Sequence, residues 1–505
     1  MNSSSVDDQS RQAHLSGGDF QIAIIGSGFG GIGMAIALKK AGIDDFVIFE
    51  RANEIGGTWR DNTYPGAACD VPSHVYSFSF EPNPNWSRAF ARSGEIQQYL
   101  LGVVEKYGLR RHLRLNTNIT NARFEEADGS WTLTTATATA SDGDFRARFV
   151  VSAVGGLVDP AFPDIKGLEN FKGKLVHAAR WDHDYDLAGK RVAVIGTGAT
   201  AIQVVPSIAP QVEKLVVFQR TPAWVMPKSD HAISERAKAL YRRLPFVQRI
   251  VRSALFWLSE AFGPVIMLDA PWLSRLGERA SQKHLEQSVP DPELRAKLMP
   301  HFQFGCKRIL ISNDYWASFD RDNVELETES IAEIREHSVV LSDGREHEID
   351  TLILATGFVL GLATAPFPVS GLGGVNLDET WKGGAVAYKG VCVSGFPNWF
   401  MIMGPNTGPG HTSVLVYSES QINYIAQAIQ RVKEDQLKYL TVRQDVQDAY
   451  NQSLQKRMPY TVWASGCNSW YLSESGENHA LFPGFASEYC ARVRKFKPSE
   501  YVRVG

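Results

Sequence analysis

The stretch that decides the fold is Gln21–Glu50, QIAIIGSGFGGIGMAIALKKAGIDDFVIFE. It opens with a short, nearly continuous apolar run, which is typical of a parallel strand buried on both faces. Three glycines follow with GxGxxG spacing: Gly26, Gly28 and Gly31. They allow a tight turn, a close approach to a pyrophosphate and close packing of the following helix. A second apolar run, Phe46–Phe49, ends at Glu50, whose carboxylate can accept hydrogen bonds from a ribose diol. The stretch therefore predicts a dinucleotide-binding unit.

A second unit of the same kind begins at Arg191–Gly196. It carries the pattern GxGxxA, in which the third position serves packing and tolerates alanine, at Gly196, Gly198 and Ala201. A residue 24 positions after the first glycine is acidic in the first unit (Glu50) and basic in the second (Arg220). A guanidinium can bind a 2′-phosphate with two parallel hydrogen bonds, whereas a carboxylate would repel it. The sequence thus predicts an FAD site followed by an NADPH site, although Arg220 alone could be a solvated charge at a strand end.

The length of 505 residues predicts several domains, and the fold class is α/β with two Rossmann-like dinucleotide-binding domains. The predicted ranges are a disordered arm (1–19), an FAD-binding domain (20–158 and 359–505), an NADPH-binding domain (159–227 and 301–358) and a helical insertion (228–300). The insertion is predicted from apolar residues spaced three or four apart, with its basic residues on a solvated face.

The composition limits which binding partners and which cellular compartment can be expected. A formal net charge of −3 gives no reason to expect nucleic acid as a partner. The five cysteines form no CxxC pair, which argues against a disulfide framework and suits a reducing compartment. The polar N-terminus lacks the apolar core of a secretory signal, and Ala254–Leu268 is interrupted by Glu260, Gly263 and Pro264, so it is expected to be too short and broken to span a membrane. We therefore expect a cytoplasmic monomer or homodimer.

An aromatic-rich loop follows the first unit and could line one face of a flavin, or simply pack in the core. Its candidate cofactor contacts are Gly57, Thr58, Trp59, Asp70 and Tyr76. Asp70 lies between apolar neighbours, where a carboxylate normally needs a cationic partner. We expect that partner to be Arg308, which with Lys307 immediately precedes an apolar segment.

Two nucleotide sites imply electron transfer from NADPH to a flavin, and the reduced flavin then needs an acceptor. A disulfide acceptor lacks its CxxC pair, and Cys69 has no clear activating neighbour. Oxygen remains. A monooxygenase needs excluded water and a fixed positive charge near the developing anion, and Arg308, positioned by Asp70, is the candidate catalytic charge.

Between the two units, the pattern FxGxxxHxxxW followed by aspartate resembles the fingerprint of type I Baeyer–Villiger monooxygenases. Its residues are Phe171, Gly173, His177, Trp181 and Asp182. The resemblance also covers GGTW (56–59), YPGAACD (64–70), FQRTP (218–222), CKR (306–308), ATGF (355–358), SGFPNWF (394–400) and GPNTG (404–408). Taken alone, a lone histidine such as His177 is more often structural than catalytic.

The resemblance implies that NADPH reduces FAD, that a flavin peroxide forms with O₂, and that it converts a small ketone to an ester or lactone, with sulfide oxygenation as a second activity. It implies that Arg308 stabilises the peroxide and the adduct, with Asp70 orienting it, and that three residues hold the 2′-phosphate: Arg220, Thr221 and Lys307. His177 and Trp181 would be linker residues that couple domain movement to catalysis, and Trp463 would cover the cofactor. Many members carry arginine where this chain has Ala68.

Three other readings stay open. An N- or S-oxygenating flavin monooxygenase shares the two-nucleotide plan. A flavin NADPH oxidase or peroxidase could use Cys69. A non-catalytic flavoprotein would bind FAD without being reduced by NADPH.

Overall fold

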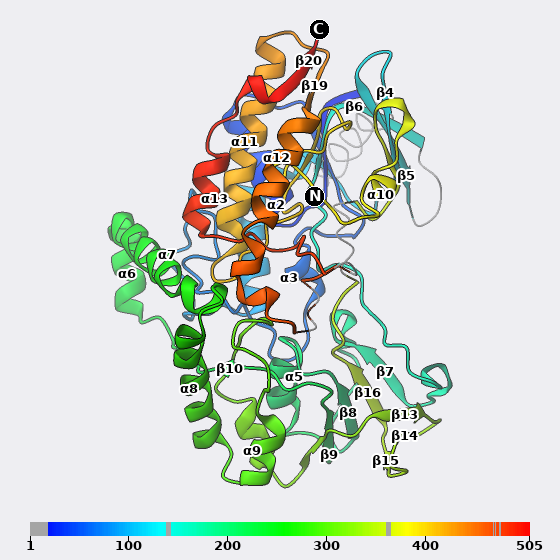
Figure 1. Cartoon of the computed structure of the whole chain (residues 1–505), viewed down its shortest axis with the longest axis vertical. Coiled ribbons are helices and arrows are strands. Elements are labelled where there is room, and N and C mark those ends of the chain that lie inside the picture. Colours follow the sequence, from blue (N-terminus) through cyan, green and yellow to red (C-terminus); the bar gives the residue numbers. More distant parts are fainter. Residues whose placement is uncertain (1–18, 138–142, 360–364, 468, 470, 474–475) are drawn as a thin grey trace, which may run out of the picture.

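The computed structural model describes residues 19–137, 143–359, 365–467, 469, 471–473 and 476–505. These residues form two α/β lobes, drawn in the upper and lower halves of Figure 1, with a helical arm along one side. The described α-helices are α2 (Phe29–Lys40), α3 (Thr58–Asp61), α4 (Ser93–Lys106), α5 (Ala201–Ile208), α6 (Glu235–Arg243), α7 (Pro245–Met267), α8 (Pro271–Ser288), α9 (Pro292–Leu298), α10 (Leu377–Thr380), α11 (Val414–Glu434), α12 (Gln444–Gln455) and α13 (Ala486–Val493).

The first lobe is built on an eight-stranded sheet with the order β17-β4-β5-β6-β1-β2-β3, in which β18 also pairs with β6. Strands β4, β5 and β6 are antiparallel, and the other pairs are parallel. The strands are β1 (Asp19–Ile25), β2 (Phe46–Phe49), β3 (Leu113–Arg114), β4 (Asn118–Glu125), β5 (Ser130–Ala136), β6 (Gly143–Ser152), β17 (Val369–Ser370) and β18 (Trp399–Met401). The last two come from the C-terminal half of the chain, which supports the proposed discontinuous first domain.

The second lobe is built on a five-stranded parallel sheet with the order β12-β9-β8-β16-β7. Its strands are β7 (Lys174–His177), β8 (Arg191–Ile195), β9 (Lys214–Phe218), β12 (Val324–Glu327) and β16 (Thr351–Leu354). Most of their side chains are buried, as expected of strands covered on both faces. Smaller pairings join β10 (Val225–Met226) to β11 (Leu310–Ile311), β13 (Ile331–Ile334) through β14 (Ser338–Leu341) to β15 (Glu346–Glu348), and β19 (Tyr439–Val442) to β20 (Tyr501–Val504).

The first βαβ unit lies in the larger core. Helix α2 packs between the sheet and α11, and its apolar residues are almost completely buried. Helix α11 begins after Ser413, whose hydroxyl accepts a hydrogen bond from the Leu415 backbone N–H and caps the helix. The strand–turn–helix order predicted for the first unit is therefore present, and β8 followed by α5 gives the second unit the same order.

Helices α6 to α9 occupy the range predicted for the helical insertion and form the green arm in Figure 1. One expectation about this range is wrong. Glu260, Gly263 and Pro264 do not interrupt the apolar segment, because Glu260 is buried with hydrogen-bond partners and Pro264 lies in the last turn of the 23-residue helix α7. Among the described residues, α7 is the one helix whose length and composition would suffice to cross a bilayer.

Two smaller expectations also need correction. The predicted disordered arm (1–19) lies outside the described residues except for Asp19, which begins β1 because it pairs with Arg146 of β6. The expectation of no disulfide is wrong, because Cys306 and Cys467 are bonded with their Cα atoms 6.3 Å apart. The two cysteines are 161 residues apart in the chain, so no local spacing pattern signals the pair.

Candidate active site

The two glycine-rich turns have the same geometry. Gly26 and Gly196 both have positive φ angles, +101° and +118°. A Cβ atom at either position would lie 2.5 Å from a backbone carbonyl oxygen, that of Ala153 or Ala355. Glycine is thus required at the first position of each turn. A Cβ at Gly31 would clash with the Gly26 carbonyl, so this glycine serves the packing of α2 on its own turn.

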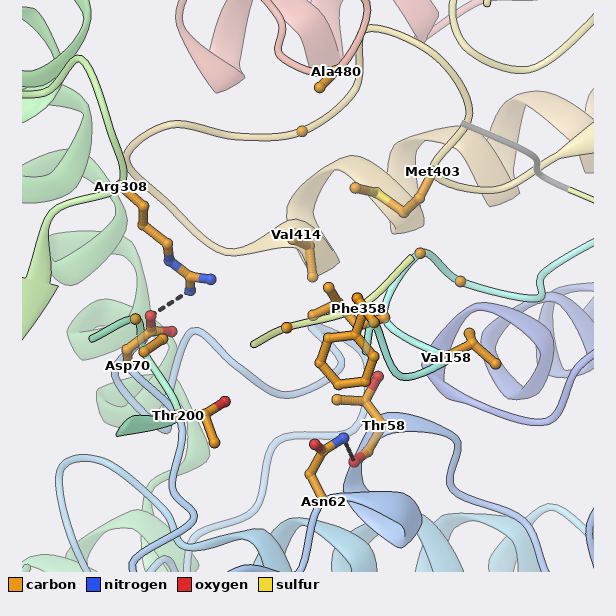
Figure 2. A pocket seen from close by; sticks show the side chains of 18 of the residues that line it. Thr58, Asn62, Asp70, Val158, Thr200, Arg308, Phe358, Met403, Val414 and Ala480 are labelled. Atoms are coloured by element: carbon orange, nitrogen blue, oxygen red, sulfur yellow. Dashed lines mark hydrogen bonds and ion pairs between the residues drawn. The ribbon is translucent and has the colours of Figure 1, made fainter. Parts of the chain in front are cut away.

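Both turns open into one cleft with a volume of about 2020 Å³. A drug-sized ligand occupies about 300–1,000 Å³, so the cleft has room for two extended dinucleotides. Figure 2 shows part of its wall, with Thr58 and Asn62 on one side and Arg308 and Asp70 on another. The predicted site residues that line it are Gly26, Gly28, Glu50, Gly57, Thr58, Trp59, Asp70, Tyr76, Gly196, Gly198, Arg220, Thr221, Lys307 and Arg308. Gly31, Ala201 and Trp463 do not line it.

The first turn presents features suited to FAD. The buried Glu50 carboxylate accepts hydrogen bonds from the backbone N–H of Ser27 and of Ala52, at 3.1 and 3.0 Å, and contacts the Arg60 guanidinium at 2.9 Å. A Cβ on Gly57, which has a positive φ of +54°, would lie 3.3 Å from the Cα of Gly28, so the two loops approach each other closely at these glycines. This cradle leaves backbone N–H groups available to a pyrophosphate.

Trp59 and Tyr76 form an aromatic wall beside this cradle. The Trp59 indole N–H donates to the Tyr76 hydroxyl at 3.1 Å, and their rings meet edge to face. Burial raises the pKa of Tyr76, so its hydroxyl stays protonated. The wall is therefore a neutral, apolar surface of the kind that an isoalloxazine ring packs against.

The second turn gathers positive charge. Arg220 and Lys307 both line the cleft, and burial together with the Arg220 charge lowers the pKa of Lys307. Among the described residues, no carboxylate pairs with either side chain. Thr197 Oγ1 donates to the Thr221 carbonyl oxygen at 2.8 Å and so fixes the loop that carries Arg220. Arg220 on this fixed loop and Lys307 ahead of β11, neither paired with a carboxylate among the described residues, fit the doubly charged 2′-phosphate of NADPH.

Arg308 and Asp70 form an ion pair on the cleft wall (Figure 2). Asp70 lies in the loop after α3, and Arg308 directly precedes β11, so the pair joins the first unit to the segment that follows the insertion. The negative charge of Asp70 raises the pKa of Arg308. The guanidinium is about half exposed into the cleft, which leaves it able to contact a second anion there.

Tyr471 is a site residue that sequence reasoning missed. It is buried, lines the cleft, and lies near enough to Arg308 for the two groups to affect each other's pKa. Burial raises the pKa of Tyr471 to about 12, so its hydroxyl is neutral at physiological pH. No motif marks this residue; its only sequence signal is the run of aromatic residues that contains it.

Gln203 is a second missed residue, and it joins the two lobes. Its side-chain amide donates to the Ala68 carbonyl oxygen at 3.0 Å and accepts from the Ala68 N–H at 3.2 Å. The same amide oxygen accepts from the Tyr64 hydroxyl at 3.1 Å. A side chain on α5 of the second unit thus pairs with the backbone of the loop that carries Asp70.

The five residues of the predicted fingerprint lie outside the cleft wall, in and beside β7. A Cβ on Gly173 would lie 2.5 Å from the Asp350 carbonyl oxygen and would also clash with the Phe171 ring. His177 Nδ1 accepts from the Ala179 N–H at 3.2 Å, and burial lowers the pKa of its imidazole. Asp182 pairs with Lys174, and Trp181 packs against the core of the second lobe. These contacts are structural, and the coupling role of His177 and Trp181 stays a prediction.

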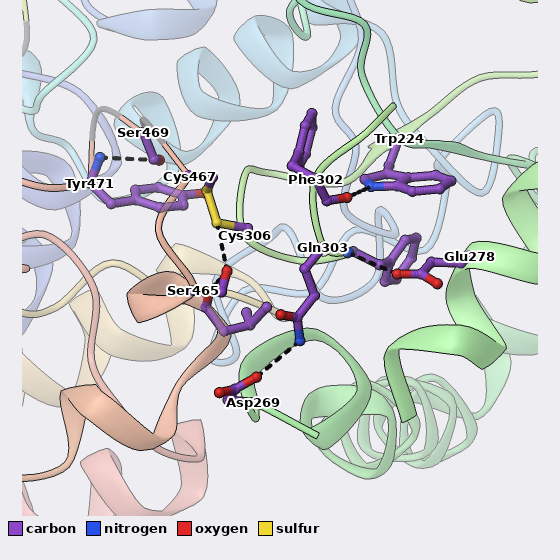
Figure 3. Close-up of a disulfide and its surroundings, with 12 residues drawn as sticks. Trp224, Asp269, Glu278, Phe302, Gln303, Cys306, Ser465, Cys467, Ser469 and Tyr471 are labelled. Carbon is purple, nitrogen blue, oxygen red and sulfur yellow. Dashed lines mark hydrogen bonds between the residues drawn. A yellow bond between two sulfur atoms is a disulfide. The ribbon is translucent and has the colours of Figure 1, made fainter. Parts of the chain in front are cut away.

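Trp463 is buried beside the cleft and does not line it. It packs with Met267 and Cys306, and its ring lies 6.3 Å from that of Tyr471, which does line the cleft. The disulfide lies in the same cluster, and Ser465 donates a hydrogen bond to Cys306 Sγ at 3.1 Å (Figure 3). The structure thus places Trp463 behind Tyr471, and its predicted cofactor contact would require a movement of this loop.

Cys69 has no catalytic character. The thiol is buried, and burial followed by the Asp70 charge raises its pKa. A thiolate is therefore not available at neutral pH, which removes the support for a cysteine-dependent peroxidase.

Comparison with known proteins agrees with this geometry. Residues 19–260 match the family model described as flavin-binding monooxygenase-like. A Baeyer–Villiger monooxygenase of Pseudomonas aeruginosa is 47% identical over 487 residues, covering 95% of this chain and 91% of that protein. Another of Streptomyces coelicolor is 44% identical over 485 residues, covering 95% of this chain and 92% of that protein.

Solved structures show the same fold. OTEMO in complex with FAD and NADP superposes with a TM-score of 0.86 at 27% identity, covering 96% of this chain and 99% of that one. An oxidised steroid monooxygenase bound to NADP gives 0.85 at 29% identity, covering 96% and 99%. These matches define a flavin-dependent monooxygenase that uses FAD and NADPH, as the sequence predicts. The chain belongs to the Baeyer–Villiger monooxygenase family.

Proposed function

We propose that the protein oxygenates small ketones to esters or lactones in this cleft, with one atom of O₂ entering the product and the other leaving as water, and that small sulfides are also substrates. Bound FAD, reduced by NADPH, supplies the two electrons that activate O₂. The observation that carries the proposal is the Arg308–Asp70 pair on the wall of a cleft that both nucleotide turns border.

Arg308 stabilises the negative charge that develops on oxygen, first during activation and then on the carbonyl oxygen of the ketone. Such preorganised donors act most strongly where water is excluded. Asp70 keeps the guanidinium in place through its ion pair and leaves part of it facing the cleft. Tyr471, buried and neutral, lies close to Arg308 on the same cleft wall.

The nucleotide-binding residues have the roles that their charges dictate. Glu50 binds the ribose hydroxyls of FAD, and Gly26, Gly28 and Gly57 leave room for its pyrophosphate. Trp59 and Tyr76 pack against the flavin ring. Arg220, Thr221 and Lys307 hold the 2′-phosphate of NADPH, and Gly196 and Gly198 leave room for its pyrophosphate. These assignments rest on cleft position and on the absence of carboxylate partners for Arg220 and Lys307 among the described residues.

The test is isotopic. The purified enzyme with FAD and NADPH is incubated under ¹⁸O₂ with a panel of linear, cyclic and aryl ketones and with methyl phenyl sulfide. We expect an ester or lactone with one ¹⁸O atom, formed in proportion to the NADPH consumed. Consumption of NADPH with hydrogen peroxide as the sole oxygen product across the panel would contradict the proposal. Sulfoxide without any ester would favour an S-oxygenating enzyme.

A further inference from the structure

Helix α7 exposes an apolar stripe to solvent, unlike an ordinary surface helix. Its outward stripe contains Phe246, Ile250 and Trp257, spaced four and seven residues apart, and all three side chains are at least 55% exposed. Two further residues of the same stripe, Ala254 and Ala261, are exposed as well. An ordinary amphipathic helix turns its apolar face to the core. This apolar stripe faces solvent along a helix about 34 Å long.

The inward side of α7 has polar side chains that anchor it to the body of the protein, followed by the apolar Val265 and Met267 near its C-terminal end. Gln248 donates to the Asn83 carbonyl oxygen at 2.6 Å, and Arg252 donates to the His74 carbonyl oxygen at 2.7 Å. Glu260 accepts hydrogen bonds from the backbone N–H groups of Ala486 and Ser487. These partners fix the rotation of the helix about its axis, so the apolar stripe cannot turn inward. They also attach α7 to the body of the protein along its length, from Gln248 to Glu260.

The patch continues onto the neighbouring helices. Ten of the eighteen exposed large apolar side chains of the described residues lie between residues 240 and 276. Trp272, at the start of α8, is 68% exposed and adds a second tryptophan. In Figure 1, α6 and α7 project beyond the rest of the protein, so a flat surface could reach them without steric conflict. Exposed patches of this extent mark interaction surfaces.

The excess of basic residues around the apolar patch indicates an anionic binding partner. Between residues 235 and 288 the chain has nine arginines and lysines against five aspartates and glutamates, whereas the whole chain has a net charge of −3. Seven of the nine basic side chains are exposed: Arg236, Arg242, Arg243, Arg249, Arg275, Arg279 and Lys283. Exposed tryptophans within an apolar stripe, bordered by arginines, match the interface of an anionic phospholipid bilayer.

We propose that the outward face of α6, α7 and the start of α8 docks on the surface of anionic phospholipid membranes. The same helix borders the active-site cleft on its inner side, through Leu255, Ser259 and Ile266. Docking would therefore set the cleft beside the bilayer. The inference goes beyond the proposed function and does not depend on it, because membrane binding is measured without turnover.

The experiment is co-sedimentation of the FAD-loaded full-length enzyme with vesicles of phosphatidylcholine alone or mixed with phosphatidylglycerol, at low and high salt. We expect binding to the mixed vesicles that weakens at high salt. The double variant Ile250→Glu, Trp257→Glu should lower the partition coefficient about tenfold or more. Val502→Glu on β20, also an exposed apolar residue, is the matched control and should bind as the parent does.

Reduction of FAD by NADPH checks that the variants are folded, since neither Ile250 nor Trp257 lines the cleft. Three results would overturn the proposal. The first is a failure of the parent to sediment with mixed vesicles, and the second is equal sedimentation of the double variant. The third is a dimer of the parent in lipid-free buffer that is absent in the double variant, which would identify a second copy of the chain as the partner of this face.

Discussion

Arg308 and Asp70 are 238 residues apart in the chain and form an ion pair on the wall of the cleft. The carboxylate thereby holds the guanidinium in place. The Asp70 charge raises the pKa of Arg308, so the pair further favours the protonated form that an arginine has already.

Arg308→Ala should abolish ketone oxygenation while NADPH still reduces FAD. The lost charge acts on developing negative charge, so we expect a fall in ester formation of about 10²–10³-fold. Stopped-flow absorbance under anaerobic conditions measures the reduction, and product analysis measures the oxygenation. Arg308→Lys keeps the charge without the planar fork and should retain part of the activity. Full ester formation by Arg308→Ala would contradict the assigned role.

Arg220→Ala should raise the KM for NADPH about 10- to 100-fold and leave the KM for NADH nearly unchanged. The reason is the loss of a charge-assisted hydrogen bond to the 2′-phosphate, worth about 1.5–3 kcal/mol. Lys214→Ala is the matched control: this cation begins β9, the strand that ends just before Arg220, and it pairs with Glu325. Equal effects of Arg220→Ala on both coenzymes would show that Arg220 does not distinguish them.

Cys69→Ser should keep both NADPH consumption and ester formation within about twofold of the parent. Burial raises the pKa of the Cys69 thiol, so it does not supply a nucleophilic thiolate. Cys392→Ser, at another buried free cysteine, controls for packing effects. A loss of turnover in Cys69→Ser alone would restore the cysteine-dependent oxidase as a candidate.

Glu260→Gln should lower the Tm at pH 7. Burial alone would raise the pKa of Glu260, but hydrogen bonds from His411 and Ser487 and the charge of His411 lower it to about 2. A depressed carboxyl pKa stabilises the fold above its ordinary value of 4.5, and this contribution is lost as the pH falls toward 2. The shift corresponds to about 3 kcal/mol at 1.36 kcal/mol per pKa unit.

Thermal unfolding followed from pH 7 to pH 3 measures this effect. The Tm difference between the parent and Glu260→Gln should shrink as the pH falls below 4.5. Glu286→Gln, on the exposed surface of α8, should show no such dependence. A constant difference across the range would mean that Glu260 contributes through packing and not through its charge.

The nucleotide units could be predicted because each is encoded locally. Gly26 and Gly196 occupy turns that exclude a Cβ, and the residues 24 positions later, Glu50 and Arg220, carry the opposite charges that the two ligands need. The Arg308–Asp70 pair could be predicted for a different reason. Each residue was an unexplained charge beside apolar neighbours, and a buried charge requires a partner.

The other features of the site and fold depend on tertiary contacts that no local sequence pattern predicts. Gln203 is one amide among many, and only the folded loop brings the Ala68 backbone to it. The disulfide joins cysteines 161 residues apart. The length of α7 was underestimated because Glu260 reads as a helix-interrupting charge, whereas His411 and the start of α13 satisfy it.

The pairing of Gln203 with both backbone groups of Ala68 bears on how this enzyme can be recombined with its relatives. The loop that carries Asp70 belongs to the first nucleotide unit, yet its backbone is held by a side chain from the second unit. A chimaera joined near residue 158 would contain the loop from one parent and the side chain at position 203 from the other. Chimaeras that exchange segments between relatives should therefore take residues 64–70 and helix α5 from the same parent.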